Sequence, residues 1–123
     1  MKTGERRALV IGSQCRELNS LSFLPAVAED LYQVLTTPDL GGCVPALSDG
    51  VGLLLDPSVA EAKAALRAAF TRASEDDATL LLAYIGHGVS VYDDFYLLPV
   101  DGSAAPDSDT GLHFVSNSRR LDL

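Results

Sequence analysis

This sequence lacks several features that mark common classes of protein. It has no tryptophan and only nine basic residues against 17 acidic ones, which gives a formal net charge of −8 at pH 7. Such a charge repels a phosphate backbone, and no cluster of lysine and arginine is dense enough to offset the repulsion. We therefore expect the chain to bind neither nucleic acid nor an anionic membrane surface.

Cysteines and long apolar runs are also scarce. Cys15 and Cys43 are too far apart for a CxxC motif, and two cysteines alone make no disulfide framework. The longest apolar run, from Leu80 to Ile85, is far shorter than the roughly 20 residues that cross a bilayer. The first residues, MKTGERRALVIG, contain no signal-peptide cleavage site. We expect a cytoplasmic protein in a reducing compartment.

Glycine-rich phosphate loops are missing as well. No GxGxxG or GxxxxGK[ST] motif follows the first apolar run, which argues against nucleotide binding. The 123 residues, 47% of them hydrophobic, are enough for one globular domain that spans residues 1–123.

Three short apolar runs alternate with two helical patterns. The runs ALVIG, VGLLLD and ATLLLAYIG are typical of strands that are buried on both faces. A first helix is predicted in LPAVAEDLYQVLTTP, where Pro25 suits the first turn. Its expected apolar face consists of Val27, Leu31, Val34 and Leu35. The stretch between this helix and VGLLLD is rich in glycine and predicts an irregular loop.

The second helix carries the clearest local signal, over residues 58–73. Ser58 and Glu61 have the spacing of a capping box, directly after Pro57. One face of the helix is apolar, and it consists of Val59, Ala62, Leu66, Ala69 and Phe70.

The order strand, helix, strand, helix, strand predicts an α/β fold with a mostly parallel sheet and helices on both faces. In such sheets the chemistry lies at the carboxyl ends of the strands. His87 follows the third strand at this edge, and the loop with Cys15 and Arg16 leaves the first strand at the same edge.

The third strand runs directly into Gly86-His87-Gly88. A histidine that acts as a general base needs a pKa near neutrality and an open approach for the reacting atom, which flanking glycines provide. A glycine after the histidine also allows a bare backbone N–H to face the site and stabilise an oxyanion. The segment beyond, VSVYDDFYLLPVD, predicts a small hairpin around Asp93-Asp94. Residues 103–123 show a polar loop and a tail without a clear period.

With its surrounding elements, this motif closely resembles caspase-like peptidases, especially bacterial caspase-family and metacaspase-like proteins. The matching segments run in family order over residues 6–102: RALVIGSQ, LPAVAEDLYQVL, LLLDPSVAEAKAALRAAF, LLLAYIGHG and FYLLPVDG. The resemblance implies a caspase-like three-layer sandwich, of which this chain holds the N-terminal part.

The resemblance also implies a function for the Gly-His-Gly motif. His87 would be the catalytic base and Gly88 the backbone donor to the oxyanion of a cysteine endopeptidase. In caspases the nucleophilic cysteine lies about 50 residues after the histidine, whereas here both cysteines precede His87. We therefore expect the nucleophile downstream of this chain and no peptidase activity from the 123 residues alone. Truncation would also leave TLLLAYIG near an unpaired sheet edge.

Other residues have competing interpretations. Cys15 could replace the missing nucleophile, but a structural thiol is the favoured reading for Cys15 and for Cys43. Arg16 and Glu17 correspond to a family loop that shapes the specificity pocket, although solvated loop charges are favoured. The preference of the site for acidic or basic residues stays open.

No cofactor is expected from the sequence. Some metacaspases need calcium, and several acidic residues follow the motif: Asp93, Asp94, Asp101, Asp107 and Asp109. Their spacing fits no EF-hand loop, and turn chemistry explains them. His113 lies in the tail without a partner pattern and is expected at the surface.

The expected partners are a peptide or protein substrate, effector or signalling modules, and the missing C-terminal part of the domain. One alternative is a non-catalytic caspase-like adaptor, whose acidic surface would favour a basic partner. A second alternative is a flavodoxin-like or receiver-like ligand-binding domain, which shares the order of strands and helices.

Overall fold

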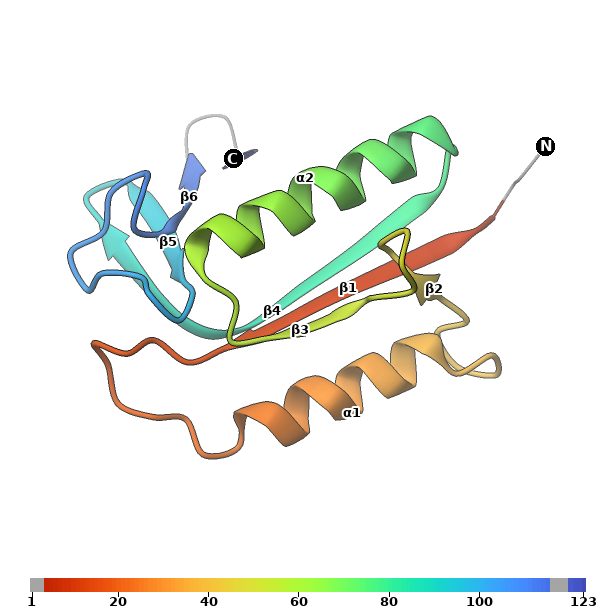
Figure 1. Ribbon diagram of the computed structural model, residues 1–123, viewed down its shortest axis with the longest axis horizontal. Coiled ribbons are helices and arrows are strands. Elements are labelled where there is room, and N and C mark those ends of the chain that lie inside the picture. Colours follow the sequence, from red (N-terminus) through yellow and green to blue (C-terminus); the bar gives the residue numbers. More distant parts are fainter. Residues whose placement is uncertain (1–3, 116–119) are drawn as a thin grey trace.

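The computed structural model describes residues 4–115 and 120–123, which form an α/β fold with one mixed sheet between two helices. The strands are β1 (Arg6–Ser13), β2 (Val44–Pro45), β3 (Leu53–Leu55), β4 (Thr79–Val91), β5 (Asp94–Leu98), β6 (Leu112–Val115) and β7 (Arg120–Asp122). The helices are α1 (Leu24–Thr36) and α2 (Val59–Glu75). They lie on opposite faces of the sheet (Figure 1).

The sheet has two parts with different strand directions. In the order β2-β1-β4-β5-β6-β7, β1 pairs in parallel with β2 and β4, and it also pairs in parallel with β3. From β4 onward the pairs β4–β5, β5–β6 and β6–β7 are antiparallel. The α/β class is confirmed. The prediction of a mostly parallel sheet was wrong, because three of the six described strand pairs are parallel and three are antiparallel.

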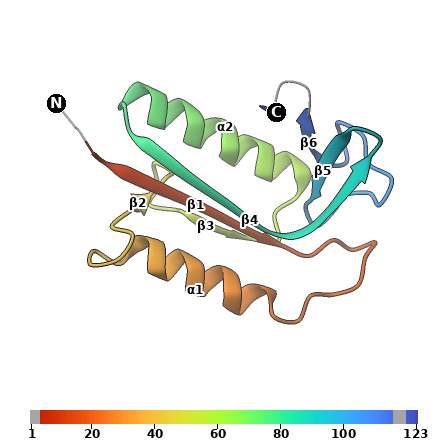
Figure 2. The ribbon, with the colours of Figure 1, turned by 180° about the vertical axis from the view of Figure 1, so that it is seen from behind.

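Strand β4 joins the two parts. Thr79–Gly86 pairs with β1, and His87–Val91 then pairs with β5. The strand curves away from β1 and carries the hairpins beyond the carboxyl end of the parallel strands, a course that is visible from both sides in Figures 1 and 2. The predicted hairpin around Asp93-Asp94 is confirmed, with Tyr92 and Asp93 between the paired strands.

The core lies mainly between the sheet and α2. Buried residues of this core include Leu9 and Ile11 of β1, Leu66 of α2 and Leu112 of β6. The N-terminus of α2 has the predicted capping box: the Ser58 hydroxyl accepts from the Glu61 N–H at 3.0 Å, and the Glu61 carboxylate accepts from the Ser58 N–H at 2.9 Å.

The apolar faces of both helices differ in part from the prediction. In α1, Val27 and Val34 are exposed, whereas Leu24 and Ala28 are buried against the sheet. Gly12 of β1 explains why this face packs on the sheet: the helix lies so close that a Cβ atom on Gly12 would lie 2.8 Å from the Ala28 Cβ. In α2 the small and branched residues of the predicted face are buried, but Phe70 is exposed.

Two segments without predicted structure contain strands. The loop that precedes VGLLLD includes β2, which extends the sheet beside the start of β1. The tail over residues 103–123 includes β6 and β7, which were missed because neither short run alternates clearly. None of the helices in the described part of the chain is both long and apolar enough to cross a membrane.

Candidate active site around His87

His87 lies at the point where β4 leaves β1. The last β4 residue that pairs with β1 is Gly86, opposite Ser13, and His87 is the first that pairs with β5, opposite Leu98. This is the carboxyl edge of the parallel strands, where the sequence predicted the site. The loop that follows β1 reaches the same edge and brings Asn19 to the histidine.

The imidazole of His87 is held by a backbone carbonyl. Its Nε2 atom lies 2.8 Å from the carbonyl oxygen of Asn19. A carbonyl oxygen only accepts hydrogen bonds, so Nε2 carries the proton in the neutral ring. The Nδ1 atom of the neutral ring then holds the lone pair and is the ring atom with the capacity to accept a proton.

The loop that supplies this carbonyl is closed by Gln14. Its side-chain amide donates to the carbonyl of Leu21 at 2.8 Å and accepts from the N–H of Leu21 at 2.8 Å. The N–H of Gln14 donates to the Asp56 carboxylate at 2.8 Å, which ties the loop to the end of β3. The segment that contains Asn19 is thus anchored at both of its ends.

Packing explains the two glycines beside His87. A Cβ atom on Gly88 would lie 2.4 Å from Cζ of Phe95, whose ring fills the place of a side chain. A Cβ atom on Gly86 would lie 2.5 Å from the carbonyl oxygen of Ser13. The backbone contact requires glycine at position 86, whereas a side chain at position 88 would force the partly exposed Phe95 ring to move.

Neither cysteine is exposed to act together with His87. Cys15 is buried beside Tyr96 and Leu98, and its thiol donates to the carbonyl oxygen of Gly102 at 3.4 Å. Cys43 is buried near β2, at the start of β1, and both cysteines are free thiols. Buried structural thiols are inert, because a peptide substrate cannot reach them.

Arg16 and Glu17 lie in the same loop as Asn19, and both side chains are exposed. The Arg16 N–H donates to the carbonyl of Val100 at 3.0 Å, and the Glu17 carboxylate accepts from the N–H of Ala104 at 3.3 Å. These contacts connect the loop to the segment after β5, so Glu17 has a structural partner.

Two of the acidic residues after the motif, Asp101 and Asp107, have separate structural roles. Asp101 accepts from the Val59 N–H at 2.7 Å, at the N-terminus of α2. Asp107 accepts from the N–H groups of Asp109 and Thr110, and the bond from Asp109 is the main cause that lowers the pKa of the Asp107 carboxyl. Over residues 4–115 and 120–123 no group of three or more His, Cys, Asp or Glu side chains has the arrangement of a metal site.

His113 is not the surface residue that the sequence predicted. It lies on β6 with 18% of its side chain exposed and stacks on Tyr96, with a ring-centroid distance of 4.7 Å. Its Nε2 lies 3.4 Å from an Asp94 carboxylate oxygen, and its Nδ1 lies 3.8 Å from one of Asp122. The register of the three antiparallel strands creates this cluster, so the linear sequence gave no signal for it.

The chain matches no family model, no curated protein and no solved structure at a significant level. The assignment of a function therefore depends on the geometry of the site and on the sequence motif.

Proposed function

We propose that this chain is the N-terminal part of a caspase-like cysteine endopeptidase domain, with His87 as its general base. The observation that carries the proposal is the hydrogen bond between His87 Nε2 and the Asn19 carbonyl oxygen, 2.8 Å long. A catalytic histidine needs a third group that fixes its tautomer and orientation, and this carbonyl supplies one. The position of His87 at the carboxyl edge of the sheet adds support.

In this mechanism the Nδ1 atom of His87 takes the proton of a cysteine thiol. The thiolate attacks the peptide carbonyl carbon, and a C–S bond forms while the carbonyl oxygen becomes an oxyanion that the Gly88 N–H stabilises. The C–N bond then breaks, and His87 returns the proton to the departing amine. Water hydrolyses the acyl-enzyme with His87 as base. No cofactor enters these steps.

The cysteine of this mechanism comes from outside the 123 residues. Cys15 and Cys43 are buried, and the sequence after His87 contains no cysteine. We propose that a segment downstream of Leu123 supplies the nucleophile in a cytoplasmic protein, together with effector or signalling modules. Alone, the chain holds the base and the oxyanion donor and has no means to form an acyl-enzyme.

Hydrolysis of fluorogenic peptides by the full translation product of the gene tests this proposal. Peptide pools should carry acidic, basic or neutral residues before the scissile bond. We expect His87→Ala to lower kcat/KM by about 10²–10⁴-fold, the usual contribution of a general base. His113→Gln, which alters the other histidine of the chain, is the matched control and should keep the activity. Equal activity of wild type and His87→Ala would contradict the proposal.

The alternative function is that of a non-catalytic adaptor. It is favoured by the burial of both cysteines and by the edge of Thr79–Gly86, with which no second strand pairs among residues 4–115 and 120–123. Full-length protein that contains no reactive thiol but binds a partner would support this alternative.

A further inference from the structure

The loop that holds His87 starts at a junction with the end of β3. The last paired residues of β1 and β3 are Gly12 and Leu55, and the N–H of Asp56 adds a hydrogen bond to the Gly12 carbonyl at 2.8 Å. The Asp56 carboxylate then accepts from the N–H of Gln14 at 2.8 Å. A side chain therefore takes over from the main chain at the point where β1 ends and the loop begins.

Asp56 makes this contact from an uncommon backbone conformation. Its φ angle is 53°, in the left-handed region that favours glycine. Aspartate adopts this region more readily than most residues, but glycine does so at no steric cost. What aspartate provides at this position, and glycine would not, is the acceptor for the Gln14 N–H.

From Gln14 the contacts lead to the imidazole in two further steps. The Gln14 side chain closes the loop onto the main chain of Leu21 with two hydrogen bonds of 2.8 Å. Asn19 lies within the closed loop, and its carbonyl oxygen is 2.8 Å from His87 Nε2. Asp56 thus fixes the main chain of the residue whose side chain closes the loop, and the direction of the Asn19 carbonyl depends on it.

A second set of contacts joins the same two segments. The Val100 N–H donates to the Pro57 carbonyl at 3.0 Å, and the Val100 carbonyl accepts from the Arg16 N–H at 3.0 Å. The junction between β3 and α2 therefore holds the loop at Gln14 directly and at Arg16 through Val100. Of these contacts the one at Gln14 uses a side chain, so a substitution can remove it without a change in the main chain.

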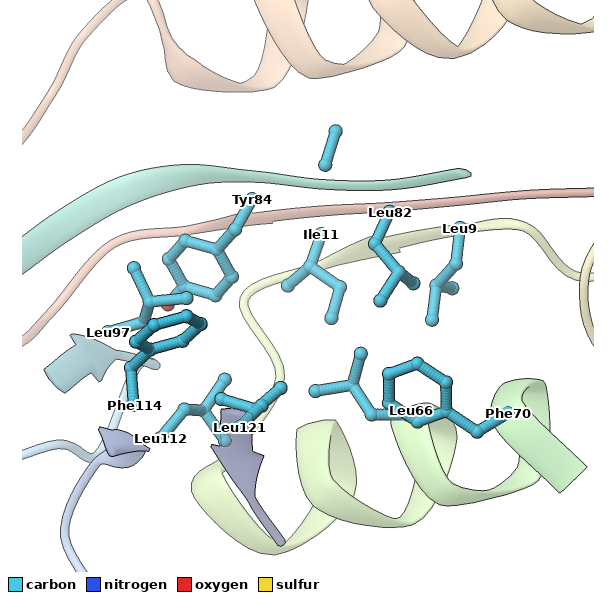
Figure 3. A pocket seen from close by; sticks show the side chains of 11 residues that line it. Leu9, Ile11, Leu66, Phe70, Leu82, Tyr84, Leu97, Leu112, Phe114 and Leu121 are labelled. Atoms are coloured by element: carbon cyan, nitrogen blue, oxygen red, sulfur yellow. The ribbon is translucent and has the colours of Figure 1, made fainter. Parts of the chain in front are cut away.

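The opposite face of β4 gives the histidine little support. Side chains alternate along a strand, so Tyr84 lies on the face away from His87, as does Gly86, which has no side chain. Tyr84 points into an apolar cavity of about 350 Å³ between the sheet and α2 (Figure 3). Packing beneath the end of β4 is incomplete on this side, and the hydrogen-bonded loop on the other side is what orients the imidazole.

We infer that Asp56 is a positioning residue for His87. It stabilises the conformation in which the loop presents the Asn19 carbonyl to Nε2, and it acts through Gln14 and not by contact with the imidazole. The inference rests on the proposed function in that His87 is taken as the general base. A loop released from Asp56 leaves the imidazole free to rotate, which lowers the fraction of molecules with the base in its reactive orientation.

Hydrogen exchange of the His87 Nε2 proton, measured by NMR on the 123-residue chain, tests the contact between Asp56 and the loop. Asp56→Gly keeps the left-handed backbone and removes the acceptor. The Nε2 proton should then exchange with water at least about tenfold faster, as expected when a hydrogen bond to a charged group is lost. Asp56→Asn keeps an acceptor oxygen and tolerates the same φ, so its exchange rate should stay close to that of the wild type. Amide exchange in β1 verifies that the sheet is intact.

Asp77 provides a matched control. Its φ angle is 52°, it is exposed after the end of α2, and within residues 4–115 and 120–123 its carboxylate accepts no hydrogen bond. Asp77→Gly makes the same chemical change with no contact to lose, and it should leave the exchange of the His87 proton unchanged. Equal acceleration in both glycine variants would overturn the inference, and so would a wild-type exchange rate in Asp56→Gly.

Steady-state kinetics of the full translation product test the consequence for catalysis. In Asp56→Gly we expect kcat to fall about 10- to 100-fold with KM nearly unchanged, because the base is misoriented while the substrate still binds. Asp56→Asn should keep most of kcat. An equal loss in both variants, or a change in KM alone, would contradict the positioning role. A wild-type product without His87-dependent activity would instead contradict the proposed function, and the NMR result would still decide whether Asp56 orients the imidazole.

Discussion

The Nε2 atom of His87 lies 2.8 Å from the carbonyl oxygen of Asn19, a residue 68 positions earlier in the chain. The contact joins the end of the parallel part of β4 to the loop that follows β1. Since the carbonyl accepts the Nε2 proton, it selects one neutral tautomer of the imidazole and leaves Nδ1 free to accept another proton.

The first prediction concerns this tautomer. In the neutral form of His87 we expect a protonated Nε2 and an unprotonated Nδ1. Long-range ¹H–¹⁵N correlation spectra of the labelled chain, recorded at alkaline pH, distinguish the two nitrogens, and His87→Gln identifies the signals. A proton on Nδ1 in the neutral ring would show that the Asn19 contact does not orient the histidine.

The second prediction concerns the loop that presents Asn19. Gln14→Ala removes both side-chain hydrogen bonds to Leu21 and should lower the free energy of unfolding by about 1–3 kcal/mol. The His87 ring resonances should shift as well, because the loop is no longer closed. Urea unfolding and NMR measure the two effects. Gln33→Ala, at an exposed position of α1, is the control and should change neither.

The third prediction concerns Gly88. A methyl group at this position collides with the Phe95 ring, so Gly88→Ala should destabilise the fold by about 1–3 kcal/mol. Adding Phe95→Leu to this variant should recover part of the loss, because the smaller side chain makes room. Thermal unfolding of both single variants and the double variant gives the coupling energy. Strictly additive effects would argue against this contact.

The fourth prediction is a pH dependence. Burial raises the pKa of the Tyr84 phenol well above its usual value, so the folded chain keeps this proton when the unfolded chain has lost it. The contribution of Tyr84 to stability is complete below about pH 10 and declines as the pH rises further. Urea unfolding at a series of pH values should show a smaller decline in Tyr84→Phe. Tyr92→Phe, at a fully exposed tyrosine, should behave like the wild type.

Local sequence signals predicted the elements of the parallel part well, except for the two-residue strand β2. The capping box at Ser58 and the apolar runs of β1, β3 and β4 depend on neighbours in the sequence, and they are found where they were expected. The orientation of α1 was only partly predictable. The exposed valines of α1 are as apolar as its buried residues, so hydrophobicity alone does not reveal which face is buried. The buried face is determined by the close approach of Ala28 to Gly12, a contact between residues far apart in the sequence.

The candidate site could also be predicted only in part from the sequence. The Gly-His-Gly motif after an apolar run identified His87, but nothing in the polar stretch SQCRELNS indicated that the backbone of Asn19 would contact it. A main-chain carbonyl is available at every residue, so side-chain identity carries no signal for it. The two hydrogen bonds by which the Gln14 side chain closes the loop onto Leu21 likewise become visible only in the fold.

The most direct test of the proposed peptidase measures how fast thiols of the full translation product react with iodoacetamide as a function of pH. We expect one thiol, located after residue 123, to react rapidly near neutral pH because His87 stabilises its thiolate. In His87→Ala the pH midpoint of this reaction should rise toward that of an ordinary cysteine, near 8.5. A full-length protein in which no thiol depends on His87 would contradict the proposal.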